Sequence, residues 1–427
     1  MSIRSVTGNR YINIIMEFIA DFHIHSKYSR ATSRDMDIRH LAEWAKLKGI
    51  TLMGTGDFTH HLWLEELKHS LEDCGNGLFK HAGVYFILTA EVSSIYSKNG
   101  RSYRIHNLIF SPSFKTVDKI NERLSRIGNL ASDGRPILGL DAAELARIIF
   151  DIDENCMIIP AHIWTPWFSL FGSMSGFDRI EDCFEKQTDK IFALETGLSS
   201  DPAMNWRLSA LDNFTLISNS DSHSPQKIGR EANIFNCAMD YKTIREVLKN
   251  KDREKFLSTI EFFPEEGKYH YDGHRLCDVR FSPEETKANN GKCPKCLKPV
   301  TVGVVNRVEK LADRPLGYVP DNPIPFKNLI PLMEIIAQVK GVGTASINVE
   351  REYRAYIAKF GTEFNMLLKC SKEELLKGLP PKLVDGILNV RAGKVVIKAG
   401  FDGEYGIISI ADNKGQDKKT EQQLSLF

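Results

Sequence analysis

The 427-residue chain has no run of about 18 apolar residues, the length that a membrane-spanning helix requires. Residues 1–10 are polar and do not have the pattern of a secretory signal peptide. The formal net charge is only +1, so a nucleic-acid partner would have to be held by a local basic patch. We therefore expect a cytoplasmic protein.

Disulfide frameworks and several common catalytic motifs are also missing. Most of the eight cysteines stand alone in apolar or mixed segments, where packed or free thiols are expected. There is no internal repeat, no Gly-rich phosphate loop and no Ser–His–Asp arrangement for nucleophilic catalysis. The remaining composition is that of an ordinary globular protein with a large core.

Short apolar runs alternate with helical patterns over the first 250 residues. This alternation predicts an α/β fold with a mostly parallel sheet, either open or closed as a barrel. The dipeptide Asn99-Gly100 between two strand-like runs predicts one antiparallel hairpin. The strand-like runs are 18–24, 50–54, 84–90, 105–110, 157–160, 191–194 and 214–218. The helical patterns are 35–48, 116–127, 142–150 and 241–248.

The character of the chain changes near residue 264. Residues 267–299 are polar with little periodicity, and 313–331 hold five prolines, which predicts an irregular connector. Helical patterns return, a hairpin over 395–410 turns at Asp402-Gly403, and 411–422 form a polar tail that we expect to be disordered. The later helical patterns are 332–339, 347–360 and 373–376.

Histidines and carboxylates follow successive strand-like runs. They are His23, His25, Asp57, Glu91, His106, His162, Asp221 and His223. A single histidine at such a place is more often an ordinary polar residue. The set is different, because the carboxyl ends of parallel strands converge on one face. Two pairs are also separated by one residue, which places both side chains on the same side. The set therefore predicts a polynuclear metal site.

The mixture of ligands indicates the chemistry of this site. Imidazole with carboxylate suits Zn²⁺, Mn²⁺ or Fe, and Mg²⁺ fits a carboxylate-rich position. Clustered divalent ions activate water and clamp the oxygens of a phosphoester. We take Asp221, His223 and Glu91 as the catalytic residues, with Glu91 and Asp221 as bridging ligands. We expect His60, His61 and Glu195 to support the ligands rather than bind metal.

A second metal site is predicted from thiolates. Cys293-Pro-Lys-Cys296 has the spacing of a zinc knuckle, and His274-x-x-Cys277 upstream has the same gap. The alternative, a redox Cys-x-x-Cys pair, is disfavoured because the motif does not open a helix after a strand. We expect one closed, structural zinc site, in which either His274 or His270 is the fourth ligand.

Two further features suggest macromolecular partners. The loop after His162 carries Trp164, Trp167 and Phe168, which either stack on a nucleotide or fill the top of the sheet. Residues 327–398 hold 12 Lys and Arg against 7 Asp and Glu, which fits DNA binding or a solvated helical face.

The last five residues form an apolar tip on a polar tail, which predicts a partner-binding peptide. It resembles the peptide that binds the bacterial sliding clamp. Its residues are Gln423, Leu424, Ser425, Leu426 and Phe427.

The first metal motif resembles the PHP (polymerase and histidinol phosphatase) domain over about residues 17–250. This resemblance implies a distorted (β/α)7 barrel that hydrolyses phosphoesters with two or three metals. Many PHP sites have Thr-Asp-His where this chain has Thr55-Gly56-Asp57, so Asp57 is expected to take the histidine's place. Some relatives carry an aspartate where this chain has Thr32, which favours two metals and a weaker third.

The whole chain except residues 1–15 is similar to the endonuclease Q family, in a bacterial form. Besides the PHP motifs, the similarity includes the segments 162–168, 268–275, 307–314 and 401–406. It implies an enzyme that nicks DNA 5′ to uracil, hypoxanthine, xanthine and abasic sites and leaves a 3′-hydroxyl. We expect a monomer associated with the nucleoid.

These observations predict a modular chain. After an extension over 1–15 we expect a PHP metallophosphoesterase domain (16–264) and a zinc-binding module (265–314). A mainly helical C-terminal DNA- and lesion-binding domain (315–410) and a clamp-binding tail (411–427) follow. The alternatives are a small-molecule phosphatase and a non-catalytic DNA-binding scaffold.

Overall fold

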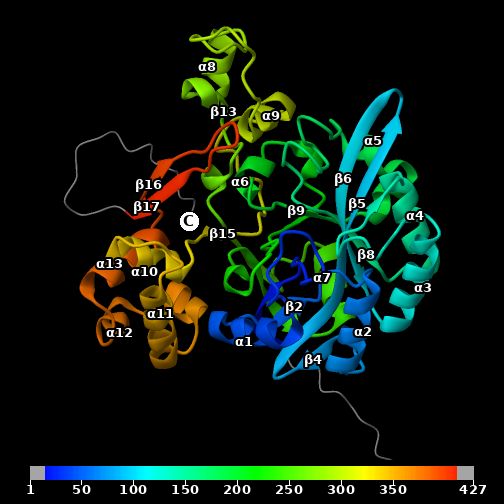
Figure 1. The fold of residues 1–427 in the computed structure, drawn as a ribbon, viewed down its shortest axis with the longest axis horizontal. Helices are drawn as coiled ribbons and strands as arrows, with labels where there is room; N and C mark the ends of the chain where they lie inside the picture. Colours follow the sequence, from blue (N-terminus) through cyan, green and yellow to red (C-terminus); the bar gives the residue numbers. More distant parts are fainter. Residues whose placement is uncertain (1–14, 411–427) are drawn as a thin grey trace, which may run out of the picture.

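The computed structural model of the chain describes residues 15–410, and its centre is a mixed sheet of eleven strands surrounded by helices (Figure 1). Hydrogen bonds join the strands in the order β15-β12-β11-β1-β2-β5-β4-β3, while β6 connects β5 to β8 and β7 pairs with β5. The strands are β1 (Ile15–Asp21), β2 (Leu52–Gly54), β3 (Glu72–Asp73), β4 (Phe79–His81), β5 (Val84–Lys98), β6 (Arg101–Ser111), β7 (Ile137–Leu138), β8 (Met157–Pro160), β11 (Ala232–Ala238), β12 (Phe256–Glu261) and β15 (Phe326–Asn328).

The predicted α/β class is confirmed, but the sheet is less parallel than expected. β1 pairs parallel with β2, and β2 with β5. The pairs β1–β11, β5–β6, β6–β8 and β11–β12 are antiparallel. Asn99 and Gly100 both have positive φ, 52° and 76°, as the tight turn of the predicted β5–β6 hairpin requires.

A separate parallel pair, β9 (Ala193–Glu195) and β10 (Thr215–Ile217), extends the central fold. The backbone N–H of Ile163, just after β8, donates to the Glu195 carbonyl (3.1 Å), and that of His25, after β1, donates to the Ser222 carbonyl (3.0 Å). The ends of β8, β9, β10 and β1 therefore lie next to one another. Side chains from these strands also share one buried core, which includes Phe18, Ile159, Ala193 and Ile217.

Within the described residues, seven α-helices belong to this N-terminal part. The first of them shows why periodic segments become helical. The Asp37 carboxylate caps α1 by accepting a hydrogen bond from the His40 N–H (2.9 Å), and Gly49 (φ 90°) ends it. The helices are α1 (Ile38–Lys48), α2 (His61–Ser70), α3 (Phe114–Ser125), α4 (Ala142–Ile152), α5 (Ile180–Phe184), α6 (Pro202–Asn205) and α7 (Tyr241–Lys249).

A small module and a helical region complete the described chain. The module projects at the top of Figure 1 and contains β13 (Asp272–His274), β14 (Val279–Phe281) and α8 (Pro283–Ala288), and α9 (Val304–Leu311) follows it. The helical region contains α10 (Leu332–Lys340), α11 (Ile347–Phe360), α12 (Lys372–Leu376) and α13 (Pro381–Arg391), with the hairpin of β16 (Val395–Lys398) and β17 (Ile407–Ile410).

The connector before the helical region differs from its prediction. Residues 326–328 form β15, which pairs with β12 and thus adds an edge strand to the central sheet. The separate helical region therefore begins after β15, later than residue 315. A buried ion pair joins it to the N-terminal part, since Lys48 Nζ of α1 lies 2.7 Å from Glu363 Oε2.

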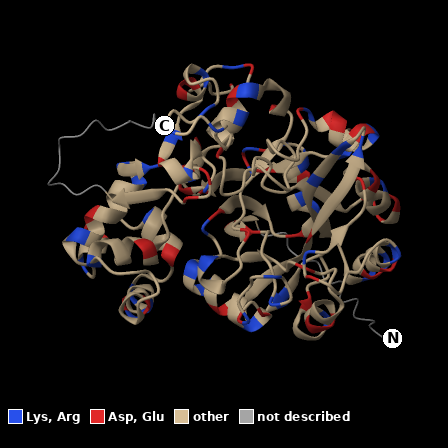
Figure 2. Cartoon of the chain, turned by 45° about the horizontal axis from the view of Figure 1, so that its top comes forward, with Lys and Arg blue, Asp and Glu red and all other residues tan. Residues whose placement is uncertain are grey.

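Residues of both charge signs occur throughout the described chain. Figure 2 shows Lys and Arg interspersed with Asp and Glu, as the net charge of +1 leads one to expect. Within residues 15–410, no helix is long and apolar enough to cross a membrane.

Candidate metal centre

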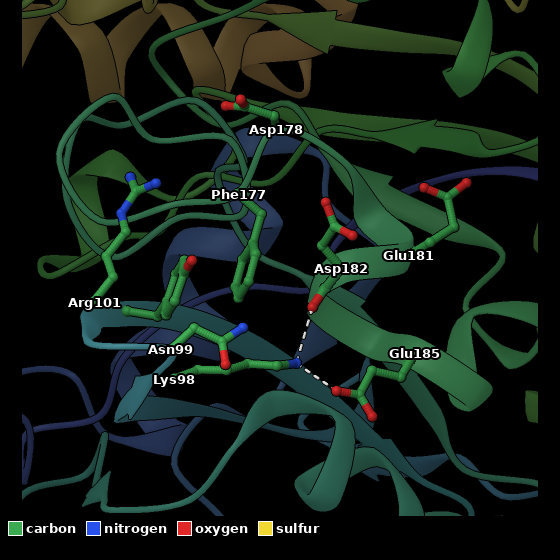
Figure 3. A pocket seen from close by; sticks show the side chains of 9 residues that line it. Lys98, Asn99, Arg101, Phe177, Asp178, Glu181, Asp182 and Glu185 are labelled. Atoms are coloured by element: carbon green, nitrogen blue, oxygen red, sulfur yellow. Dashed lines mark hydrogen bonds and ion pairs between the residues drawn. The ribbon is translucent and has the colours of Figure 1, made fainter.

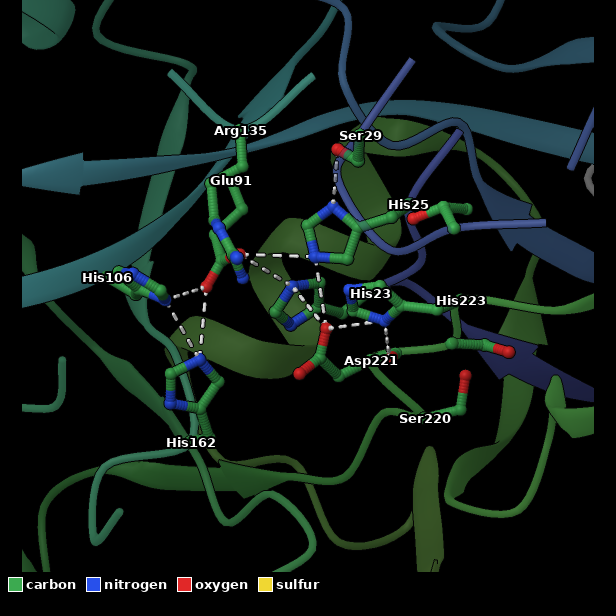
Figure 4. A network of polar contacts seen from close by, with 12 residues as sticks. His23, His25, Ser29, Glu91, His106, Arg135, His162, Ser220, Asp221 and His223 are labelled. Atoms are coloured by element: carbon green, nitrogen blue, oxygen red, sulfur yellow. Dashed lines mark hydrogen bonds and ion pairs between the residues drawn. The ribbon is translucent and has the colours of Figure 1, made fainter. Parts of the chain in front are cut away.

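Four of the predicted ligands form one compact group. Ligand atoms of His23, His25, Glu91 and Asp221 all lie within 4.8 Å of one another (Figure 4). The histidines follow β1, Glu91 lies within β5, and Asp221 follows β10. Convergence of strand ends, inferred from the sequence, accounts for His23, His25 and Asp221, whereas Glu91 reaches the group from the interior of β5.

Glu91 also belongs to a second group, with His106 and His162. Its Oε1 lies 2.7 Å from His106 Nδ1 and 3.1 Å from His162 Nε2. Its Oε2 lies 3.2 Å from His25 Nε2 and 3.5 Å from His23 Nε2. One carboxylate therefore faces two sets of imidazoles with its two oxygens, which is the arrangement of a ligand that bridges two cations.

Several atoms at the centre of these groups form no hydrogen bond within the described chain. They are Nε2 of His23 and His25, and Oδ1 of Asp221. Buried polar atoms without partners are costly and rare in folded proteins. Imidazole nitrogens and a carboxylate oxygen aimed at one point match the donor set of a divalent cation, so these residues fit a metal centre.

The far sides of the same imidazoles are held by carboxylates. The Glu195 carboxylate lies 3.0 Å from His23 Nδ1 and accepts the backbone N–H of His162 (2.8 Å), which agrees with its expected supporting role. Such contacts fix the tautomer and leave Nε2 for the metal. His60 and His61 lie outside both groups.

Asp57 has a different place from the one predicted, and its assignment as a metal ligand is wrong for this structure. Its Oδ1 lies 3.0 Å from His25 Nδ1, and its Oδ2 accepts hydrogen bonds from Ser26 and Ser29. Both oxygens are thus engaged behind His25. Gly134 packs so closely here that a Cβ would lie 2.2 Å from Asp57 Oδ2, which excludes a larger residue.

His223 lies at the open edge of the centre. Its ring is 4.6 Å from that of His25, and its Nδ1 lies 3.0 Å from the Asp221 carbonyl. It is not part of the compact groups, and its side chain is 32% exposed.

The backbone around the centre is unusual. Asp57, His162 and Asp221 have φ values of 49°, 30° and 46°, in a region that side-chain-bearing residues rarely adopt. Such conformations persist when surrounding contacts hold them, and they are concentrated at functional sites.

Arg135 is a site residue that the sequence did not reveal. Its Nη1 donates to Glu91 Oε2 (3.1 Å), and it lies on the loop between α3 and β7. Burial alone would raise the pKa of Glu91, but His106, Arg135 and His23 hold it well below its ordinary value. Burial lowers the pKa of His106 to about 4. The surrounding basic groups thus favour the ionised form of Glu91, the form that binds metal.

The aromatic loop divides into buried and accessible parts. Trp164 is fully buried and its indole N–H donates to Asn205 (2.8 Å), so the prediction that it contacts DNA does not hold in this conformation. Phe168 is half-buried, with its ring 4.9 Å from His106, and Trp167 packs edge-on against Tyr269 (5.4 Å). Trp167 and Phe168 thus keep partly accessible side chains, whereas Trp164 does not.

The four residues of the predicted zinc site also come together. Ligand atoms of His274, Cys277, Cys293 and Cys296 lie within 4.8 Å of one another. His274 Nδ1 is 3.6 Å from Cys296 Sγ, whereas the buried His270 lies outside the group, so the geometry selects His274. Three sulfurs and one imidazole fit a tetrahedral zinc site.

A separate concavity lies beside the tip of the β5–β6 hairpin (Figure 3). It has a volume of about 450 Å³, and Lys98, Arg101 and four acidic residues are among those that line it. Lys98 Nζ donates to the Asp182 carbonyl (3.1 Å) and pairs with Glu185. None of its lining residues belongs to the metal-ligand groups.

Comparison with known proteins places the chain among relatives from archaea and bacteria. Residues 331–394 match the family described as the MJ0043 C-terminal domain. The chain is 36% identical over 269 residues to the uncharacterized protein MJ0043 of Methanocaldococcus jannaschii. The matched region covers 61% of this chain and 33% of that protein. It thus spans about a third of that relative's length. It is 30% identical over 410 residues to the uncharacterized protein YqxK of Bacillus subtilis, covering 91% and 98% of the two chains.

Two solved structures share nearly the whole fold. The lesion-specific endonuclease PfuEndoQ from Pyrococcus furiosus has a TM-score of 0.84 at 33% identity, covering 94% of this chain and 98% of that one. An endonuclease Q in complex with a 27-mer duplex bearing an abasic lesion has a TM-score of 0.83, also at 33% identity, covering 94% and 99%. Identity and coverage of this extent show that the chain belongs to the endonuclease Q family.

Proposed function

We propose that the protein is a metal-dependent DNA-repair endonuclease. It would hydrolyse the phosphodiester bond 5′ to deaminated bases (uracil, hypoxanthine, xanthine) and to abasic sites. The observation that carries this proposal is the buried Glu91 carboxylate shared by two groups of imidazoles, in a chain that is similar over 94% of its length to a lesion-specific endonuclease. The related complex holds a duplex with an abasic lesion at its active site, which supports DNA as the substrate class.

Each side chain has a distinct task in this proposal. When bound, divalent ions (Zn²⁺, Mn²⁺ or Mg²⁺, two or three in number) supply an activated water and neutralise charge on the phosphate. His23, His25 and Asp221 would hold one ion, His106 and His162 another, and Glu91 would join both. The contact of His223 Nδ1 with the Asp221 carbonyl favours the tautomer whose Nε2 is an acceptor, which suits a weaker third ion.

The carboxylates behind the imidazoles set their orientation. Replacing Asp57 by asparagine is expected to weaken binding of the catalytic metal by about 10- to 100-fold, because His25 loses its anionic partner. Metal affinity is measured by titration with a fluorescent competitor chelator. Asp37→Asn is the matched control, since Asp37 contacts His40 Nδ1 in the same way (2.9 Å) at the start of α1. Equal affinities of both variants would contradict the supporting role of Asp57.

The lesion base would be flipped out of the duplex toward Trp167, Phe168 and the C-terminal region. Flipping costs less for a poorly paired base, which contributes to selectivity. Arg104 lies 5.4 Å from the Phe168 ring, so a cation is available beside this aromatic surface for a phosphate or base.

The finer organisation remains part of the proposal. We infer a PHP-type distorted (β/α)7 barrel, a module held by one structural Zn²⁺ at His274, Cys277, Cys293 and Cys296, and a C-terminal DNA- and lesion-binding domain. We also infer a monomer that works in the cytoplasm at the nucleoid. The predicted extension over 1–15 lies almost entirely outside the described residues.

The clamp-binding peptide, residues 423–427, also lies outside the described residues. We expect that deleting it abolishes binding to a bacterial sliding clamp and leaves basal nicking unchanged, because the metal centre is built from other segments. Surface plasmon resonance with immobilised clamp, beside a nicking assay, measures both. Clamp affinity that survives the deletion would disprove the peptide's role.

Metal-dependent nicking tests the proposal as a whole. We expect the protein to cut a duplex with one abasic site, to lose this activity in EDTA, and to regain it with added Mn²⁺ or Mg²⁺. Hydrolysis of p-nitrophenyl phosphate without any cut in DNA would instead favour a small-molecule phosphatase. Absence of both activities would favour a DNA-binding scaffold.

A further inference from the structure

The projecting module carries an exposed apolar tip that the metal centre does not explain. Leu276 is 84% exposed and Leu297 is 72% exposed. Each is the chain neighbour of a cysteine in the thiolate group, Cys277 or Cys296, whose sulfurs lie within 4.8 Å of each other. The two leucines therefore flank the thiolate group in the chain, and their exposure shows that neither is buried in a core.

Local contacts hold the tip rigid. Lys295 Nζ donates to the Cys277 carbonyl (2.6 Å), which ties the two halves of the module together. The Leu297 N–H donates to the Cys293 carbonyl (2.8 Å) in a tight turn, where Leu297 has a φ of 61°. A rigid apolar tip loses little conformational entropy when it binds, which suits an insertion device.

Exposed cations lie near the two leucines in the sequence. Arg275, Lys292, Lys295 and Lys298 are all exposed and lie within five residues of one or the other leucine. The segment from 275 to 298 contains six Lys and Arg but only three Asp and Glu, although the whole chain is almost neutral. This positive charge complements a polyanion and disfavours binding to a protein surface that is basic or has few acidic residues.

The tip is also connected to the metal centre by packed residues. The Arg275 N–H donates to Asp402 (2.6 Å) in the turn of the C-terminal hairpin. Tyr269, just before β13, packs against Trp167, and the neighbouring Phe168 packs against His106. A DNA duplex that presents a phosphate to the centre would thus extend along this surface toward the module.

We propose that Leu276 and Leu297 insert into a groove of the DNA duplex while Arg275, Lys292, Lys295 and Lys298 contact its phosphates. This inference rests on the proposed function, because it takes duplex DNA as the partner. Apolar wedges flanked by basic residues are a recurrent means of binding and bending a duplex. The tip would act on undamaged and damaged DNA alike, and so would position the duplex rather than read the lesion.

The experiment measures binding of the full-length protein to a fluorescent, undamaged duplex by anisotropy over a series of salt concentrations. The double variant L276S/L297S should bind roughly tenfold more weakly at every salt concentration. The double variant K292Q/K298Q should reduce the slope of log affinity against log salt by about 2, one unit for each lost phosphate contact. L316S is the matched control, because Leu316 is 85% exposed in the connector and should leave binding unchanged.

Two readouts keep the outcome clear. Zinc content and the melting temperature of each variant should equal those of the wild-type protein, since all four substituted side chains are exposed. Wild-type affinity and slope in both double variants would overturn the proposal, even if the wild-type protein nicks damaged DNA. Weakened binding as predicted, in a protein that cuts no lesion, would support the tip and disprove the proposed activity.

Discussion

Replacing Asp221 by asparagine is expected to lower nicking of lesion-bearing DNA by at least about a thousandfold and to leave DNA binding within about twofold. Asp221 Oδ1 lies 3.0 Å from His25 Nε2 and 3.6 Å from His23 Nε2 and forms no hydrogen bond with residues 15–410. Asparagine has nearly the same shape but removes the negative charge that would hold a cation beside these imidazoles. Single-turnover nicking and anisotropy with an abasic-site duplex measure the two properties.

Asp118→Asn serves as the control for this variant. Asp118 is an exposed aspartate that pairs with Lys68 on the surface, so its replacement should change neither property. Because the carboxylates of the centre repel one another when no cation is present, D221N is also expected to keep its melting temperature. Nicking by D221N within tenfold of the wild-type rate would show that the reacting phosphate is bound elsewhere.

Removal of the Lys48 side chain is expected to have the largest effect on stability. Lys48 and Glu363 are 2% and 3% exposed at their side chains, and their ion pair joins α1 to the helical region. Lys48→Ala would leave the Glu363 carboxylate buried without its counter-charge, although Tyr353 and the Leu332 N–H still donate to it. Loss of one partner of a buried pair costs about 3–5 kcal/mol.

Chemical denaturation followed by tryptophan fluorescence measures this loss in the free energy of unfolding. Lys340→Ala is the control, since the Lys340–Glu352 pair is partly exposed and should contribute less than about 1 kcal/mol. The double variant Lys48→Met/Glu363→Leu should recover most of the stability, because it buries no unpaired charge. Equal destabilisation by Lys48→Ala and Lys340→Ala would contradict the role of the buried pair.

The sequence predicted those parts of the protein that depend on local patterns. The segment 157–160 is β8 and 347–360 is α11, each with the predicted bounds, because their apolar spacing is regular. Helix α13 was missed, since Gly386 and two prolines at its start obscure its periodicity. β11 was missed because asparagines interrupt its apolar run, yet Asn233 is buried and donates to the carbonyls of Ala20 and Ser218.

The sequence predicted which residue types gather at the site, but not which of them face its centre and which lie behind the others. Strand-end position identifies which side chains converge, and this sufficed for His23, His25 and Asp221. Glu91 belongs to the same group, although β5 continues beyond it to Lys98. It cannot distinguish a residue that faces the centre from one that lies behind it, as Asp57 does. Arg135 could not be predicted for another reason. It contacts Glu91 from an irregular loop, and the sequence has no periodic pattern there from which its position could be inferred. In the aromatic loop, Trp164 is buried, whereas Phe168, whose φ is 63°, has a partly accessible ring.

The position of the nick tests the central claim most directly. Duplexes labelled at the 5′ end of one strand and carrying one deoxyuridine, one deoxyinosine, one abasic site or no lesion are incubated with the protein and Mg²⁺ or Mn²⁺. We predict a single product that ends with a 3′-hydroxyl immediately 5′ to each lesion, absent from the undamaged duplex and from reactions with EDTA. Cleavage of undamaged DNA at the same rate, or no cleavage of any duplex, would contradict the account.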